Sequence, residues 1–445
     1  VLVPNRFIVF IATMTSLLSP RIVHVLCLLS LSSPFAGVAL QAAKPLAQDY
    51  TAIWHNPDPE RYVEGCGLVK MDDGAFVAVV PVVPRLKWSE ERRATQSRVH
   101  LVRSTDQGRT WQPASELPYY SAIPFVHAGR LYLFANLGGT RYRNNDLLLL
   151  RSDDGGKTWS EPVTLFKGHY WNCHTGIVVK NNTLYAATDN LGLGSSYGSV
   201  VDLKKDARRG SCVVAGDLTR DLMDPAAWRI SNTVPLKPIP RELVAPKYAA
   251  NNNGDLYLEP NVIEVAGKLR VLATVKPSRQ TSANLGVVMD LTDTEGKLEL
   301  SFAQYFSMPG GQLKYCVIWD EPSKMFWATA NLVVDSQGVF DWWEKGNERG
   351  NYWGTGGNDR RTLMLQYSLD GINWIQAGCI AQAPKISQSF MYARPVVDGD
   401  DLAVISRSSV NAPNQHDADY ATFHRVKNFR SLALDLVPQP EGKAP

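Results

Sequence analysis

The stretch Arg151-Ser-Asp-Asp-Gly-Gly-Lys-Thr-Trp159 has an in-register copy earlier in the chain. That copy is Arg103-Ser-Thr-Asp-Gln-Gly-Arg-Thr-Trp111, and the paired serines and tryptophans are each 48 residues apart. A third copy, one residue shorter, is Ser368-Leu-Asp-Gly-Ile-Asn-Trp374. A repeat of about 40 to 50 residues in a chain of short apolar runs is typical of a β-propeller.

The residue types in this pattern predict a turn that is held by its own side chains. Asp bonds to nearby backbone amides, and Gly adopts a positive φ without steric cost. Ser and Thr make similar contacts, and Trp offers a large apolar face to a neighbouring sheet. We therefore interpret the pattern as structural rather than as a ligand site.

The pattern Ser-x-Asp-x-Gly-x-Thr-Trp resembles the Asp-box, or BNR repeat, of the sialidase-like β-propellers. The resemblance implies an all-β fold, a six-bladed propeller of the sialidase type. It implies less about activity, because Asp-boxes also occur in lyases and in non-catalytic propellers.

Six segments repeat an apolar run, a tight turn and a second apolar run, which predicts six β-hairpins. They cover residues 68–79, 125–134, 177–186, 262–272, 317–327 and 396–405. Six hairpins fit six blades, with five blades as the alternative. We expect one propeller over residues 44–437 and a disordered tail over residues 438–445.

The N-terminal 43 residues predict an export signal, which implies a periplasmic or extracellular protein. Arg21 precedes an apolar run with small residues after it. Met14 offers a more usual start, so residues 1–13 are interpreted as a wrongly extended start. Pro34 and the shortness of the run argue against a membrane anchor.

The composition excludes several functional classes. The net charge of +3 on 445 residues comes with no basic stripe, which argues against a nucleic-acid partner. Five cysteines follow the signal without C-x-x-C spacing, and we expect mostly buried thiols with room for one disulfide. No zinc-ligand spacing or phosphate-loop motif occurs, so we predict no cofactor and no metal, in a monomer.

Two segments resemble the parts of sialidases that carry the nucleophile and its base. Glu259, in Leu-Glu-Pro-Asn, precedes a predicted hairpin and matches the base. Tyr392, in Ser-Phe-Met-Tyr-Ala-Arg, matches the nucleophile. Tyrosine is a poor nucleophile at its ordinary pKa of about 10, so a carboxylate that takes its proton makes chemical sense. The structural alternatives are a solvated Glu and a core Tyr.

The expected acid and cations match less well. Glu91 stands near the position of the general acid, where the family usually has Asp and where an exposed turn is the alternative. Sialidases hold the substrate carboxylate with three arginines, because a planar guanidinium binds it in two contacts. No intact triad is visible: Glu64 lies in the region of the first arginine and Lys276 in that of the second, while Arg394 and Arg407 could contribute.

The late motif Gln-His416-Asp417 and a Pro-Gly-Gly segment at 309–311 resemble a less-characterised branch of the family. His416 and Asp417 are expected to pair near the channel. Trp171 and His174 precede another hairpin, and we consider His174 as an acid or base beside a sugar-stacking Trp171. A lone His is more often structural.

The leading hypothesis is an exported, exo-acting glycoside hydrolase for a terminal, anionic sugar of a glycan. Tyr392 is the nucleophile, Glu259 its base and Glu91 the acid. A two-carboxylate mechanism with Glu64 and Glu259 is the alternative. A polysaccharide lyase that uses His174 and Tyr392 on a uronate, or a non-catalytic carbohydrate-binding propeller, remains open.

Overall fold

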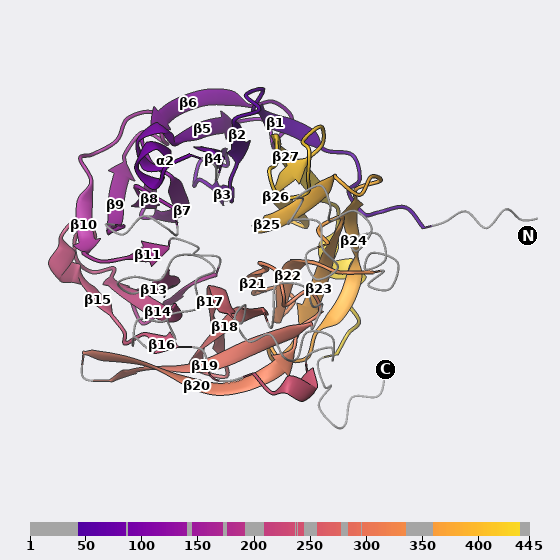
Figure 1. Ribbon diagram of the computed structural model, residues 1–445. Coiled ribbons are helices and arrows are strands. Elements are labelled where there is room, and N and C mark those ends of the chain that lie inside the picture. The colour runs from indigo at the N-terminus through magenta and orange to yellow at the C-terminus, as the bar shows by residue number, and fades with distance from the viewer. Residues whose placement is uncertain are drawn as a thin grey trace, which may run out of the picture. The chain divides into compact units, whose positions relative to one another are not determined.

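Six antiparallel sheets follow one another around a central channel in the computed structural model (Figure 1). The structure describes residues 43–85, 88–139, 145–171, 176–191, 209–235, 237, 239–243, 256–276, 284–294, 296–334 and 359–436. The expected export signal, the tail, His174 and Cys173 lie outside this part of the chain. The fold is an all-β, six-bladed propeller, and the six predicted hairpins are confirmed.

Each sheet begins with an inner strand at the channel and proceeds outward along the chain. The first contains β2 (Arg61–Val63), β3 (Gly67–Lys70), β4 (Phe76–Pro84), β5 (Arg98–Ser104) and β6 (Gln112–Leu117). The second contains β7 (Ser121–His127), β8 (Arg130–Asn136), β9 (Leu147–Ser152) and β10 (Val163–Phe166). The third contains β11 (Tyr170–Trp171), β12 (Ile177–Lys180), β13 (Thr183–Asn190), β14 (Gly210–Asp217), β15 (Trp228–Ile230) and β16 (Val234–Pro235).

The second half of the chain repeats the arrangement. The fourth sheet contains β17 (Leu256–Val265), β18 (Lys268–Lys276), β19 (Leu285–Thr294) and β20 (Lys297–Ser307). The fifth contains β21 (Cys316–Asp320), β22 (Met325–Asn331), β23 (Thr362–Ser368) and β24 (Ile375–Gln382). The sixth contains β25 (Ser389–Asp398), β26 (Asp401–Ser409) and β27 (Tyr420–Val426).

The outermost strand of the sixth sheet comes from the other end of the chain. β1 (Thr51–His55) pairs antiparallel with β27, with Thr51 opposite Phe423 and His55 opposite Tyr420. The first and last parts of the propeller are therefore joined by a backbone ladder.

The three repeated turns connect the third and fourth strands of their sheets and are braced as expected. In the first, Asp106 accepts from the Thr110 amide at 2.9 Å and hydroxyl at 2.7 Å, and Ser104 Oγ accepts from the Gly108 amide at 2.9 Å. In the third, the Asn373 side chain replaces the Thr and donates to Asp370 at 2.8 Å. In the first turn, the hydrogen bonds that Asp106 accepts from Thr110 and from the Ser104 hydroxyl lower the pKa of Asp106 below its ordinary value.

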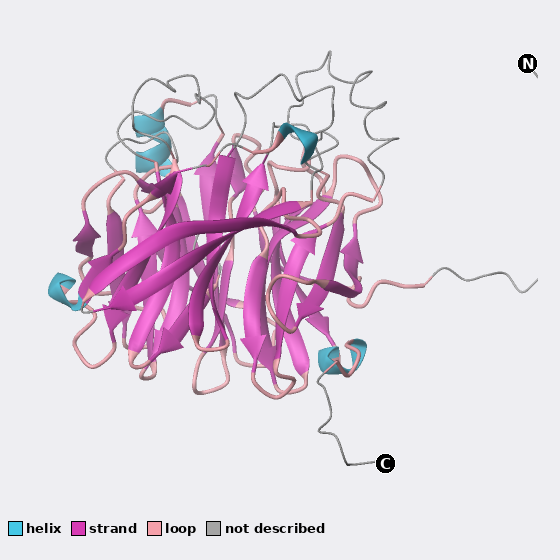
Figure 2. Cartoon of the chain, turned by 90° about the horizontal axis from the view of Figure 1, so that it is seen from below, coloured by secondary structure: helices cyan, strands magenta, loops and turns pink. Residues whose placement is uncertain are grey.

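A short helix was not expected from the sequence, which shows no helical periodicity of useful length. Helix α2 (Glu90–Gln96) follows the Ser89 cap, whose hydroxyl accepts from the Arg92 amide at 3.2 Å. Tertiary contacts of Arg93, described below, compensate for its shortness. It lies at one end of the strands, opposite the hairpin turns (Figure 2). The other short elements are the 3-10 helices η1 (Pro225–Ala227), η2 (Arg241–Leu243) and η5 (Phe429–Leu432).

The core lies between neighbouring sheets rather than in the channel. Tyr257, Val271 and Val287 of the fourth sheet pack against Tyr185 and Val213 of the third, for example. Among the described residues, no helix is long and apolar enough to cross a membrane. Among the described cysteines, Cys66, Cys212 and Cys379 are free thiols, and Cys66, Cys212 and Cys316 are buried.

Replacing Gly108 by alanine is expected to destabilise the protein by about 2–5 kcal/mol. Gly108 has φ +85°, and a Cβ there would lie 2.3 Å from the Phe423 ring. The left-handed conformation costs an L-residue about 1–2 kcal/mol, and the overlap adds about 1–3 kcal/mol. Gly74 is the matched control, because its φ is +82° with nothing within 4 Å of the Cβ position. Urea unfolding measures both variants, and equal losses would contradict the role of the Phe423 contact.

Candidate active site

The inner strands of four sheets are interrupted at equivalent positions. β2 and β3 both pair with β4 and leave residues 64–66 between them, and β11 and β12 both pair with β13 around residues 172–176. β17 and β25 each carry a β-bulge. On the second strand of each sheet, the residue opposite the interruption is five positions after the first residue of that strand. These residues are Pro81 of β4, Thr188 of β13, Ala273 of β18 and Ser406 of β26.

The candidate residues from the sequence fall at these interruptions. Glu64 lies in the first, Glu259 in the third and Tyr392 in the fourth, while His174 is outside the described residues. A bulge re-aims a side chain and is common next to active sites. The propeller therefore directs side chains from separate blades toward one end of its channel.

The backbone at two of these positions is strained. Glu259 has φ +55° and Tyr392 has φ +51°, and both lie at the bulge of an inner strand. A left-handed conformation is unusual for residues other than Gly and Asn, especially for a bulky one. Such strain costs about 1–3 kcal/mol and persists where the surrounding structure enforces it, often at functional sites.

Three cations surround the Tyr392 ring. Arg360 Nη2 donates to Tyr392 Oη at 3.2 Å, and Arg360 is only 1% exposed. The Arg407 guanidinium carbon lies 5.3 Å from the ring centroid, and Lys314 Nζ lies 5.9 Å from it. Sequence reasoning gave no role to Arg360, which precedes β23, or to Lys314, which ends the segment that begins with Pro-Gly-Gly and precedes β21.

Arg407 is fully buried and is held from two sides. Its Nη1 forms an ion pair with Glu64 Oε1 at 2.9 Å, and its Nη2 donates to the His416 carbonyl. Burial of Glu64 opposes ionisation, but the charges of Arg407, Lys314 and Arg93 help to outweigh it and lower the Glu64 pKa. Glu64 is therefore a carboxylate at neutral pH.

His416 and Asp417 pair, as expected, behind Arg407. His416 Nδ1 lies 2.9 Å from Asp417 Oδ1, and Arg85 Nη1 binds the other Asp417 oxygen at 2.5 Å. Burial and the Arg407 charge lower the pKa of His416 to about 4, so its ring is neutral near pH 7. Asp417 has a pKa lowered to about 2, because its contacts with His416 and Arg85 outweigh its burial.

The pKa of Glu259 is shifted in the opposite direction to that of Glu64. Burial raises its pKa, Lys314 and Arg209 oppose the rise, and the charges of Asp189 and Glu64 add to it. Its backbone amide donates to Asp189 Oδ2 at 3.4 Å, and Asp189 is itself paired with Arg209. Because Lys314 acts on both carboxyl groups, Glu64 and Glu259 share one electrostatic environment.

An aromatic wall completes the site. The Trp171 ring lies edge-on to Tyr120 with centroids 5.5 Å apart, and the Tyr120 and Tyr62 hydroxyls are 3.3 Å apart. Arg93 of helix α2 is 4% exposed and donates to the Tyr120 hydroxyl at 2.7 Å. Glu91 lies in the first turn of the same helix with an exposed side chain.

Two other predicted residues stand apart from this group. Arg394 lines a cavity farther along the channel and donates to the Pro124 carbonyl at 3.2 Å. No hydrogen bond or ring contact joins it to Tyr392 or Glu259 in the described part of the chain. Lys276 ends β18, where its backbone pairs with Leu256, and its side chain lies outside the described residues. Among the residues described, no group of His, Cys, Asp and Glu could hold a metal ion.

The solved structures that resemble this chain include a sialidase, an arabinanase, an arabinofuranosidase and a protein of unknown function from Dyadobacter fermentans. Trypanosoma rangeli sialidase matches with a TM-score of 0.54 and 14% identity, over 88% of this chain and 61% of that one. The fold is that of a sialidase propeller. Penicillium chrysogenum α-L-arabinanase matches with a TM-score of 0.50 and 13% identity, over 86% and 98% of the chains.

A Fusarium graminearum α-L-arabinofuranosidase matches with a TM-score of 0.52 and 11% identity, over 86% of this chain and 98% of that one. The chain spans about three-fifths of the trypanosomal sialidase and nearly all of the two fungal enzymes. No family model matches the chain, and no curated protein matches it in sequence.

Proposed function

We propose that the protein is an exo-acting glycoside hydrolase that removes a terminal, anionic sugar from a glycan. The observation that carries the proposal is the strained backbone of Glu259 and Tyr392 at equivalent bulges of two inner strands. Names of the solved relatives, which include sialidases and arabinanases, support the class of reaction. The expected export signal in residues 1–43 fits a glycan substrate outside the cytoplasm.

In the proposed mechanism, Tyr392 Oη attacks the anomeric carbon while Glu259 takes its proton. The bond from that carbon to the leaving oxygen breaks, and the leaving oxygen takes a proton from an acid, for which Glu91 is the candidate. Water then attacks the same anomeric carbon and gives a proton to the Glu91 carboxylate. The bond from that carbon to Tyr392 Oη breaks, and Glu259 returns its proton to this oxygen as the sugar is released. Covalent catalysis divides one difficult step into two easier ones.

The cations of the site account for an anionic sugar. Arg360, Lys314 and Arg407 surround the Tyr392 ring, and guanidinium groups bind carboxylates in a planar, two-contact geometry. Trp171 supplies an apolar face on which a sugar ring can stack. These groups bind and orient the substrate beside the strained tyrosine.

One observation favours a second mechanism for the same reaction. The pKa of Glu64 is lowered and that of Glu259 is raised, and carboxyl pairs displaced in opposite directions often divide the work of catalysis. Glu64 would then be the ionised nucleophile or base and Glu259 the acid. Tyr392 would only position the substrate.

The test is release of reducing sugar from a panel of anionic and neutral glycans. We expect release by the wild type and a loss of about 10²–10⁴-fold in Glu259→Gln, because Glu259 moves a proton in either mechanism. Glu264→Gln on the same strand is the matched control, since Glu264 pairs with Lys180 at 2.9 Å, away from the site. An unsaturated uronate product would show that the enzyme is a lyase rather than a hydrolase. Absence of turnover on every glycan would indicate a propeller that binds carbohydrate without catalysis.

A further inference from the structure

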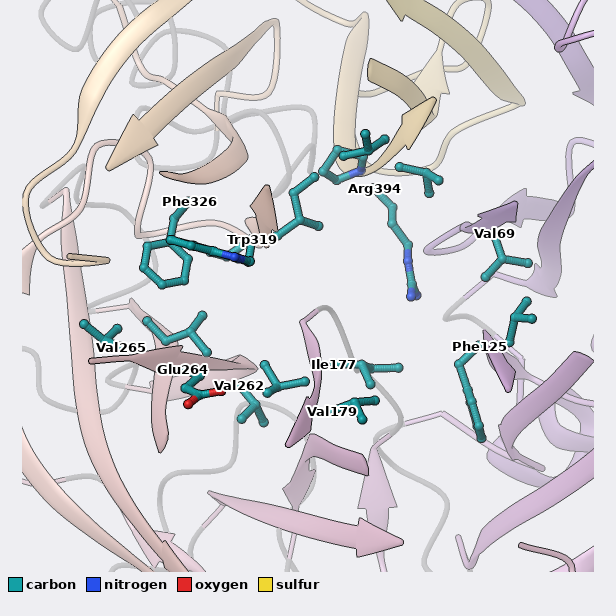
Figure 3. Close-up of a pocket in the computed structure, with 18 of the residues that line it drawn as sticks. Val69, Phe125, Ile177, Val179, Val262, Glu264, Val265, Trp319, Phe326 and Arg394 are labelled. Atoms are coloured by element: carbon teal, nitrogen blue, oxygen red, sulfur yellow. The ribbon is translucent and has the colours of Figure 1, made fainter. Parts of the chain in front are cut away.

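A cavity lies in the channel beyond the candidate active site. It has a volume of about 830 Å³ and is lined by the inner strands of all six sheets. Most of the residues that line it are apolar, and they include Val69, Phe125, Ile177 and Val262 (Figure 3). None of the residues around Tyr392 described above lines it, apart from Arg394 two residues farther along β25.

Three ionisable residues line this cavity, and two of them are paired with opposite charges. Lys70 binds Asp398 at 2.6 Å, and Glu264 binds Lys180 at 2.9 Å. Arg394 has no carboxylate partner in the described part of the chain. Its guanidinium projects into the cavity (Figure 3), and its contact with the protein is the Pro124 carbonyl at 3.2 Å.

The other terminal nitrogen of Arg394 is buried without a hydrogen-bond partner among the described residues. Burial lowers the pKa of Arg394, and the group that opposes this effect is the Cys316 thiol rather than an acid. A guanidinium remains charged in proteins, and although the Arg394 side chain is only partly buried, a buried nitrogen of a charged group that has no partner is costly. An anion in the cavity would remove this cost.

We propose that the channel cavity binds a small monovalent anion, of the size of chloride or formate, on Arg394. One positive charge balances one negative charge. Lys70, the other cation that lines the cavity, is paired with Asp398, so Arg394 supplies one uncompensated charge and the site does not favour a divalent oxyanion. The site is separate from the proposed sugar site and does not depend on it.

Thermal unfolding in sodium chloride and in sodium gluconate, at constant ionic strength, tests the proposal on the full chain. For an anion that binds near 1 mM, raising chloride to about 100 mM should raise the wild-type Tm by about 2–4 °C. Arg394→Met should abolish the rise and Arg394→Lys should retain part of it. Lys70→Met is the matched control, because Lys70 lines the same cavity but is already paired, and it should keep the rise.

Formate, in place of chloride, shows whether a carboxylate can occupy the site, and a rise with either anion supports the proposal. No rise with either, a rise with sulfate alone, or an equal rise in Arg394→Met would overturn it. If Arg394→Met does not fold, wild-type crystals in bromide decide. An anomalous peak within contact distance of Arg394 supports the site, and its absence contradicts it.

Discussion

Tyr392→Phe is expected to lower kcat/KM for glycan hydrolysis by about 10⁴-fold or more, with a much smaller change in KM. The variant keeps the ring, its contacts with Arg407 and Lys314 and the strained backbone, but it lacks the oxygen that forms the covalent bond. Removing a nucleophile affects the transition state more than the ground state. Steady-state release of sugar from the best glycan of the panel measures both constants.

Tyr185→Phe is the matched control for this substitution. Tyr185→Phe also removes a hydroxyl group that is hydrogen-bonded, because Tyr185 Oη donates to Asp293 Oδ2 at 2.7 Å. Tyr185 lies on the second strand of the third sheet rather than on an inner strand. Its activity should equal that of the wild type. Near-normal turnover in Tyr392→Phe, together with a large loss in Glu64→Gln, would contradict the tyrosine mechanism and favour the two-carboxylate one.

The pH profile gives an independent distinction between the mechanisms. An ordinary glutamic acid has a pKa of about 4.3. The pKa of Glu259 is raised, so Glu259 gains its proton at a higher pH. If Glu259 is the base for Tyr392, kcat/KM falls as pH drops through that raised value. If Glu259 is the acid, the same ionisation limits activity on the alkaline side instead.

The propeller was predictable because its signals are local. Each hairpin combines two apolar runs with a turn, and each Asp-Gly turn is braced within one short segment, as Asp106 and Thr110 are. The six hairpins therefore followed from the sequence. The pairing of β1 with β27 could not be predicted, because the sequence of residues 51–55 contains no signal for the strand with which it pairs.

The site was only half predictable, because its charges come from unrelated segments. Glu259 and Tyr392 were recognised by resemblance, but sequence reasoning gave no role to Arg360 or Lys314, and Arg93 lies on a helix too short for periodicity. Arg394 was grouped with Tyr392 because the two lie close together in the sequence. In a regular strand, alternate residues share a face. The bulge between Met391 and Arg394 breaks that alternation, and Arg394 lines the separate cavity.

Glu64→Gln is expected to reduce the free energy of unfolding by about 3–5 kcal/mol, because it leaves a buried charge without its partner. Arg407 is fully buried, and its ion pair with Glu64 spans 2.9 Å. In the double variant Glu64→Gln/Arg407→Met, the unpaired charge is gone, so part of the loss should be recovered. Urea unfolding of the wild type, both single variants and the double variant gives the coupling energy.

The control pair is Lys297–Glu299, at 2.8 Å on the surface of β20, where Glu299→Gln should change stability by less than about 1 kcal/mol. The pKa of Glu64 is lowered, so its contribution is present above the unfolded value of about 4.3 and is lost as pH falls through the lower folded value. If the two single substitutions, Glu64→Gln and Arg407→Met, had effects that simply add in the double variant, the ion pair between Glu64 and Arg407 would be contradicted. A strong coupling energy would mean that Glu64 holds Arg407 beside Tyr392, so a loss of activity in Glu64→Gln alone could not identify Glu64 as the nucleophile.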